Sequence, residues 1–174
     1  MLNWTLLLSR ALINGAWLSL VLTVIMIISG RIALDMWVGD YPPDIRQKYG
    51  PMSARAARAR PYFAVAVFTA VLVIPILGLL ALRAGLGSVP FTAAMAFAGA
   101  AVFIFNLYDL LVLDWLFFCT IQPRAMVLPG TEGMAGYRDY RFHFIGFLKG
   151  LGFCLVGGLV IAGLWMGVQA LIPG

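Results

Sequence analysis

Four long runs of apolar residues, almost free of charge, constrain the fold of this chain more than any other feature. A helix needs about 20 apolar residues to cross roughly 30 Å of hydrocarbon. The apolar runs cover residues 11–30, 62–82, 94–116 and 148–171. Only 11% of the 174 residues are charged, compared with about 25% in soluble domains. The sequence therefore predicts an all-α polytopic membrane protein, a four-transmembrane-helix bundle that forms one domain over residues 1–174.

The first apolar run lies where a secretory signal peptide would lie. The apolar region of a signal peptide has about 7–15 residues and precedes a cleavage site made of small residues. The run 11–30 is longer and has no such site after it. We therefore expect this segment to be a retained membrane span.

The positive charges are distributed unevenly about the apolar runs. Ten of the twelve lysines and arginines lie in or just after the connections 31–60 and 121–143, while Arg10 and Arg83 lie on the other side. Cytoplasmic loops carry the excess of positive charge, so we expect a cell-membrane (plasma-membrane) protein with both connections in the cytoplasm and both termini outside. Short interfacial helices and contacts with anionic lipid headgroups are expected in these connections. No nucleic-acid-binding motif accompanies the basic residues, so nucleic acid is not expected as a partner.

The third apolar run contains the polar residues Asn106, Asp109 and Asp114. A carboxylate at the centre of a membrane helix costs about 2.5–3.5 kcal/mol, so such groups need partners. Asn106 lies three residues before Asp109, and we expect its amide to donate to that carboxylate. Asp114 follows Asp109 by five residues, about 140° around a regular α-helix. The two acids should therefore point in different directions, and the depth of Asp109 in the membrane depends on where the span begins.

The connection after this run supplies most of the candidate functional side chains. In a catalytic reading, His143 is an acid or base that Asp114 or Glu132 orients, and nearby arginines hold an anionic headgroup or phosphate. In a structural reading, the same groups form a belt of ion pairs that seals the bundle at the interface. The candidate binding residues are Asn106, Asp109, Arg124, Tyr137, Arg138, Asp139 and Arg141.

Residues suited to metals, cofactors or redox chemistry are sparse. The chain has one histidine, and Cys119 and Cys154 lie in apolar runs without metal-ligand or dithiol spacing. Phosphate-cradling loops, zinc-protease motifs and nucleophile elbows are absent from the sequence. The sequence therefore predicts neither a metal site nor a cofactor.

Small residues recur every four positions in the fourth apolar run, and such ridges let helix backbones approach closely. We expect this ridge to pack against Ala94 and Ala98 of the third run. A second set of small residues, Gly163 and Gly167, is a candidate surface for a homo-oligomer or another membrane protein. The ridge consists of Gly146, Gly150, Cys154, Gly158 and Ala162.

Three classes of function fit these features. The first is a binding or accessory membrane protein whose polar, basic cytoplasmic interface meets anionic lipid headgroups or a partner. The second is a membrane-embedded enzyme that acts on a lipid or polyprenyl headgroup and predicts a pocket between the third and fourth spans. The third is a small proton- or cation-coupled transporter that uses Asp109. The sequence favours the first class and leaves open whether the protein is an enzyme.

Overall fold

The computed structural model describes residues 3–172 and confirms an all-α fold. Four helical segments are long and apolar enough to cross a membrane, as a multi-pass membrane protein requires. The described residues contain no strand, and each helical segment extends past its apolar run at one or both ends. The segments are α1 (Trp4–Ile32), α3 (Ala54–Leu86), α4 (Phe91–Tyr108) with its continuation η2 (Asp109–Ile121), and α5 (Tyr140–Leu171).

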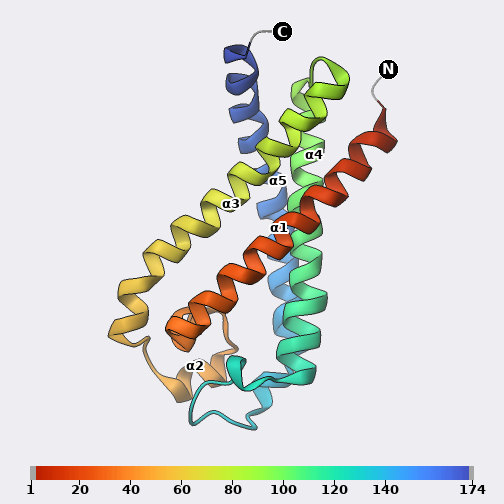
Figure 1. The fold of residues 1–174 in the computed structure, drawn as a ribbon. Helices are drawn as coiled ribbons and strands as arrows, with labels where there is room; N and C mark the ends of the chain where they lie inside the picture. The colour runs from red at the N-terminus through yellow and green to blue at the C-terminus, as the bar shows by residue number, and fades with distance from the viewer. Residues whose placement is uncertain (1–2, 173–174) are drawn as a thin grey trace.

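Both termini and the short α3–α4 turn lie at one end of the molecule, and the two longer connections lie at the other (Figure 1). The first connection contains η1 (Leu34–Asp40) and α2 (Pro43–Tyr49). The second contains the short turns η3 (Arg124–Met126) and η4 (Ala135–Arg138). The first connection contributes Gly39 and Asp40 to the pocket described below.

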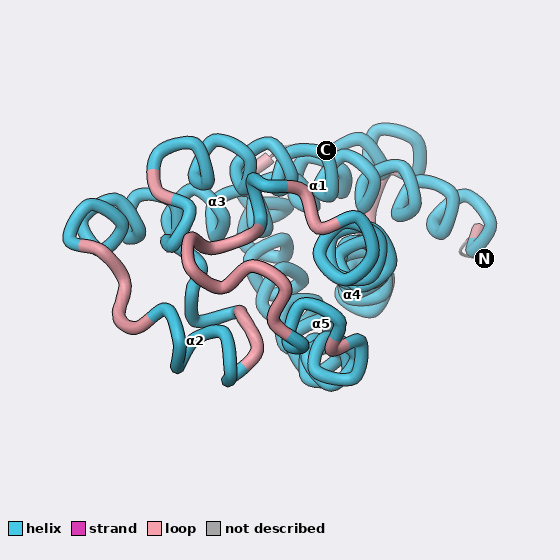
Figure 2. Tube along the Cα trace, turned by 90° about the horizontal axis from the view of Figure 1, so that it is seen from below, coloured by secondary structure: helices cyan, strands magenta, loops and turns pink. Residues whose placement is uncertain are grey.

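Helix α4 packs closely on α5, and the two lie side by side when viewed from the loop end (Figure 2). Ala94 and Ala98 are fully buried. A Cβ atom on Gly158 would lie 3.1 Å from the carbonyl oxygen of Met95 and 3.2 Å from Cα of Gly99. The structure thus confirms the predicted contact between the glycine ridge of α5 and the alanine-rich part of α4.

Helix α1 lies against both α4 and α3. A Cβ atom on Gly15 would lie 2.8 Å from the backbone oxygen of Ala101, so α1 and α4 are in nearly backbone-to-backbone contact. On the other side, the amide of Asn14 donates to the carbonyl of Ile74 in α3 at 3.0 Å. Helix α1 therefore links α3 to the central pair formed by α4 and α5.

The outward faces of the helices remain strongly apolar. The side chains of Trp17, Phe68 and Phe153 are 59%, 69% and 75% exposed, respectively. Soluble monomers rarely present contiguous apolar surfaces of this kind, whereas lipid solvates them readily. The exposed faces therefore fit the membrane environment predicted from the sequence.

The two longer connections, residues 33–53 and 122–139, fold together into what we call the loop cap. Its small core includes the rings of Tyr41 and Tyr137, packed on Phe118 of η2 at centroid distances of 5.1 and 5.2 Å. The carboxylate of Asp44 accepts a hydrogen bond from the backbone of Gly136 at 3.0 Å, joining one connection to the other. The two connections of the loop cap therefore form one packed unit over the loop-side ends of η2 and α5.

The first connection also determines where α3 begins. The buried carboxylate of Asp35 accepts hydrogen bonds from the backbone and hydroxyl of Ser53, and the Ser53 hydroxyl accepts from the backbone of Ala56 at 3.2 Å. An oxygen acceptor at this position satisfies an otherwise unpaired helix N–H. Helix α3 consequently begins at Ala54, well before the apolar run at residue 62.

Candidate functional site

The third span changes its hydrogen bonding where its polar residues begin. After Tyr108, the 13 residues of η2 form a π-helix. The backbone N–H of Gln122 closes this segment by donating to the carbonyl of Phe117, five residues earlier, at 2.8 Å. Helical segments with this i→i+5 pattern are rare in proteins, and those that do occur are often found at functional sites.

The π-helix corrects the expectation that Asp109 and Asp114 point in different directions. That expectation assumed a regular α-helix, in which residues five apart are about 140° apart. When hydrogen bonds join residues five apart, such residues lie nearly one above the other along the helix. Both aspartates consequently line one pocket.

The pocket lies between η2 and α5, with η1 of the loop cap beside it, and has a volume of about 350 Å³. Its apolar lining comes mainly from phenylalanine, leucine and isoleucine side chains. We call it the site pocket and define it by its polar residues, which are Asp40, Asn106, Asp109, Asp114, His143 and Lys149.

The side chains of Asp114 and His143 contact each other in the pocket. Oδ1 of Asp114 lies 3.0 Å from Nδ1 of His143, whose side chain is only 6% exposed. The rings of Phe118 and Phe142 pack against the imidazole at centroid distances of 4.8 and 5.3 Å. Because Nδ1 is directed at a carboxylate, Nε2 is the ring nitrogen that is left for another hydrogen-bond partner. Within residues 3–172, that Nε2 atom has no hydrogen-bond partner.

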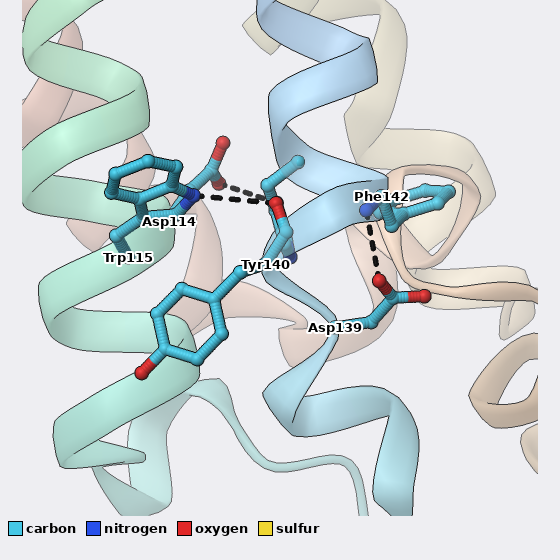
Figure 3. A network of polar contacts seen from close by, with 6 residues as sticks. Asp114, Trp115, Asp139, Tyr140 and Phe142 are labelled. Atoms are coloured by element: carbon cyan, nitrogen blue, oxygen red, sulfur yellow. Dashed lines mark hydrogen bonds and ion pairs between the residues drawn. The ribbon is translucent and has the colours of Figure 1, made fainter.

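Backbone contacts around the pair fix the start of α5 relative to η2 (Figure 3). The indole N–H of Trp115 donates to the carbonyl of Tyr140 at 3.3 Å. The carboxylate of Asp139, the residue directly before Tyr140, caps α5 by accepting from the backbone of Phe142 at 2.9 Å. These bonds position His143 opposite Asp114.

Asn106 lies farther into the bundle, where it joins α4 to α5. Its amide donates to the carbonyl of Phe147 at 3.2 Å, and within residues 3–172 we find no hydrogen bond from it to Asp109, contrary to the prediction. A Cβ atom on Gly150 would fall within 2.2 Å of the Asn106 side-chain oxygen. Glycine at position 150 therefore leaves room for the asparagine.

Asp40 and Lys149 are the polar site residues that sequence reasoning missed, and Asp40 is the one that the first connection supplies. It stands at the end of η1 and is exposed, yet enough protein surrounds it that desolvation raises the pKa of its carboxyl. The charge of Asp114 raises this pKa further, whereas Arg60 and Arg46 lower it. Nothing in the sequence near Asp40 signals this placement, because only the folded loop cap brings η1 to the pocket.

The other predicted catalytic and anion-binding residues lie outside the site pocket. Glu132 is exposed and accepts a hydrogen bond from the backbone of Gly130 at 3.1 Å. Arg124 and Arg141 are exposed at the loop end, and Arg138 borders a separate recess of about 340 Å³. The fold thus brings Asn106, Asp109, Asp114 and His143 together and keeps Glu132 and these arginines apart from them.

Tyr137 lies in the interior of the loop cap. Its hydroxyl accepts from the backbone N–H of Leu128 at 2.8 Å and contacts the hydroxyl of Thr131 at 2.7 Å. The Thr131 hydroxyl in turn donates to the carbonyl of Leu128 at 2.7 Å. Since Tyr137 and Thr131 are each 1% exposed, these bonds form a buried network that shapes the second connection.

We expect Tyr137→Phe to loosen the loop cap, because it leaves the buried N–H of Leu128 without an acceptor. An unsatisfied buried donor costs about 1–3 kcal/mol. Hydrogen exchange should therefore speed up about tenfold or more in residues 123–139, since about 1.4 kcal/mol corresponds to a factor of ten. Tyr140→Phe is the matched control, because its hydroxyl makes a similar contact with Thr120, at 2.9 Å, in an exposed position. Equal hydrogen-exchange rates in the two variants would contradict the claim that the Tyr137 hydroxyl stabilises the loop cap.

Comparisons of the chain with models of protein families, with curated proteins and with solved structures found no match. The chemistry of the site pocket is therefore the main guide to function. Carboxylates predominate in it, and in residues 3–172 no group of three or more histidine, cysteine, aspartate or glutamate side chains is arranged to hold a metal ion. Such a pocket is suited to a ligand that brings its own positive charge and hydrogen-bond donors.

Proposed function

We propose that this multi-pass membrane protein binds a membrane-lipid headgroup that carries a primary ammonium and a phosphate. One observation carries the proposal: the carboxylates of Asp40, Asp109 and Asp114 line the same pocket as the ammonium of Lys149. Carboxylates accept short, charge-assisted hydrogen bonds from an ammonium group, and a lysine attracts phosphate. A ligand with both charges complements the lining better than a purely anionic one.

The size of the pocket supports a headgroup as its occupant. Small-molecule sites usually measure about 300–1,000 Å³, and the volume of about 350 Å³ is at the lower end of that range. A water-sized ion needs only about 30 Å³. The space therefore fits a short polar group of several atoms.

The register of the helices supports a position near the loop-side boundary of the hydrocarbon. At the opposite end, the indole N–H of Trp165 donates to the carbonyl of Val89 at 3.0 Å, which aligns α5 with the start of α4. At 1.5 Å per residue, Asp109 is about 27 Å from Phe91 and Lys149 is about 24 Å from Trp165. A hydrocarbon core is about 30 Å thick, so a pocket at this level would meet lipid headgroups.

The exposed basic residues support contacts with the surrounding membrane surface. Arg55 and Arg58 on the first turns of α3 are exposed, as are Arg124, Arg138 and Arg141. Juxtamembrane arginines contribute about 1 kcal/mol each near an anionic leaflet. We infer that the loop cap faces the cytoplasm and the termini face outward, with these arginines against anionic headgroups in the cell membrane.

A second candidate function is catalysis on the same headgroup, and the Nε2 atom of His143 is the observation that favours it. A histidine that a carboxylate orients through Nδ1 can act as a general base through Nε2. Such an enzyme would direct water at the headgroup phosphorus, breaking the bond to the glycerol oxygen, which takes up the proton, and releasing phosphoethanolamine and diacylglycerol, whereas a binding protein would leave the lipid intact. Mass spectrometry of the lipid after incubation with the protein distinguishes the two.

The direct test is a binding titration of the purified full-length chain in a maltoside detergent. The probes are short-chain phosphatidylethanolamine, phosphatidylcholine and phosphatidylglycerol, together with free phosphoethanolamine. We expect the ethanolamine lipid to bind at least about tenfold more tightly than the choline and glycerol lipids, because it alone donates ammonium hydrogen bonds. Equal binding of the three lipids would contradict the proposal. Equally tight binding of free phosphoethanolamine would overturn the assignment to a lipid and indicate a soluble ligand.

A further inference from the structure

We propose that the site pocket exchanges a proton for its ligand, so that a proton leaves the cluster of Asp109, Asp114 and His143 when the ammonium group binds. The inference rests on the proposed function, because it describes how the same pocket receives that headgroup. It adds a property that binding alone does not require: the affinity depends on proton concentration. No covalent bond changes, and the released proton passes to the buffer.

The proposal begins with the geometry of the two aspartates on η2. Asp109 and Asp114 line the same pocket, and both are only partly exposed. Two carboxylates that share a poorly hydrated site disfavour each other's ionisation. A positive charge placed between them relieves this repulsion, and a proton and an ammonium group are two ways to supply it.

His143 supplies a second position for that proton. The Nδ1 atom of the imidazole lies 3.0 Å from Asp114 and therefore lies next to the negative charge of the two carboxylates. In the described part of the chain, its Nε2 atom has no hydrogen-bond partner. A proton on the imidazole and an ammonium group among the carboxylates neutralise the same negative charge. The binding of one therefore makes the binding of the other less favourable.

Charged groups on the neighbouring elements complete the balance. Lys149 of α5 lines the pocket, and Asp40 of η1 faces Asp114. Arg60 of α3 and Arg46 of α2 lie close enough to Asp40 to influence its charge. When the phosphate of the headgroup engages Lys149, the ammonium becomes the main cation left for Asp109 and Asp114, and it displaces the proton.

The direction of the pH effect follows from this exchange. Protons compete with the ammonium, so affinity rises with pH while the cluster loses its proton and then levels off. If one proton is exchanged, the dissociation constant changes by at most about tenfold per pH unit. Asp40 borders the cluster, and desolvation raises the pKa of its carboxyl above the ordinary value, so a proton on Asp40 adds to the competition above the pH range of an exposed aspartate, whose pKa is about 3.9.

The test is titration calorimetry of the full-length chain with short-chain phosphatidylethanolamine at one pH in Pipes and in Hepes, neither of which carries a primary ammonium or a phosphate. These buffers have different heats of ionisation, so the dependence of the binding heat on the buffer counts the protons released. We expect about one proton per ligand. In Asp114→Asn we expect less than about half of that value with measurable binding retained, because the variant leaves one carboxylate in the pair.

The outcomes separate this inference from the proposed function. Binding with no difference between the buffers would overturn proton exchange and leave headgroup binding intact. Failure of the wild-type chain to bind the lipid at all would overturn the proposed function itself. Asp44→Asn serves as the control, because its carboxylate lies in the loop cap and an asparagine oxygen can still accept from Gly136. The number of protons released by Asp44→Asn should equal that of the wild type. If Asp44→Asn released no proton, the released proton could not be assigned to the cluster in the site pocket.

Discussion

The Asp109→Asn, Asp114→Asn double variant is expected to bind short-chain phosphatidylethanolamine at least about a hundredfold more weakly than the wild type. Hydrogen bonds to charged groups contribute about 1.5–3 kcal/mol each, and two such bonds correspond to a factor of a hundred or more. Asparagine has nearly the same shape as aspartate, so the pocket keeps its volume. The amide oxygen of residue 114 can still accept from Nδ1 of His143, and the fold should be retained. Titration calorimetry measures the affinity, and thermal unfolding checks the fold.

Asp44→Asn is the matched control for this loss, since it removes one negative charge from the loop cap outside the pocket. Its affinity should stay within about twofold of the wild type, as surface substitutions away from a site usually have small effects. A double variant that unfolds normally and still binds like the wild type would show that the two carboxylates do not hold the ammonium group.

Gly15→Ala is expected to destabilise this bundle strongly. The new Cβ atom would lie 2.7 Å from Cβ of Ile104 and 2.8 Å from the backbone oxygen of Ala101. Helices α1 and α4 would have to separate, because a backbone oxygen cannot rotate away as a flexible side chain can. Overpacking of this kind typically costs about 1–3 kcal/mol. The melting temperature, followed by tryptophan fluorescence in one detergent, should fall by several degrees.

Gly30→Ala on the same helix separates the clash from the effect of alanine itself. No atom lies within 4 Å of a Cβ atom built on Gly30, apart from the local backbone. Alanine is favoured over glycine in a helix by about 1 kcal/mol, so the melting temperature of this control should be unchanged or higher. Similar destabilisation in both variants would contradict the close α1–α4 contact.

The membrane architecture could be predicted from the sequence because lipid imposes its requirements on every segment separately. Each span needs its own apolar run, and the four runs were therefore recognisable without knowledge of their contacts. The ridge containing Gly158 was predictable for a similar reason, since close helix contact in a bilayer requires small residues at regular spacing. Both features depend on local sequence.

The π-helix η2 could not be predicted in the same way. Its hydrogen bonds connect backbone groups, and the apolar side chains between Asp109 and Asp114 are equally compatible with a regular α-helix. The predicted angle between the two aspartates followed from that regular geometry. The change of hydrogen-bond pattern is what brings both carboxylates into one pocket.

The candidate site was predictable only where its residues adjoin the two long helices. Asp114 and His143 stand at the loop ends of neighbouring spans, so their approach follows from the antiparallel packing of those spans. Asp40 reaches the pocket through the fold of the loop cap, which depends on contacts between distant residues such as Asp44 and Gly136. Glu132 lies near His143 in sequence, yet the turns between them leave it exposed outside the pocket.

Solid-state NMR of the reconstituted full-length chain would test the central claim most directly. The measurement is the dipolar coupling between two labelled nuclei: the ammonium nitrogen of the phosphatidylethanolamine headgroup and the carboxyl carbons of the protein's aspartates. The account predicts a nitrogen–carbon distance of about 3–4 Å, as a hydrogen-bonded ammonium–carboxylate pair requires, and loss of that coupling in the Asp109→Asn, Asp114→Asn double variant. Absence of the coupling in the wild type, or its persistence at full strength in the double variant, would contradict the claim.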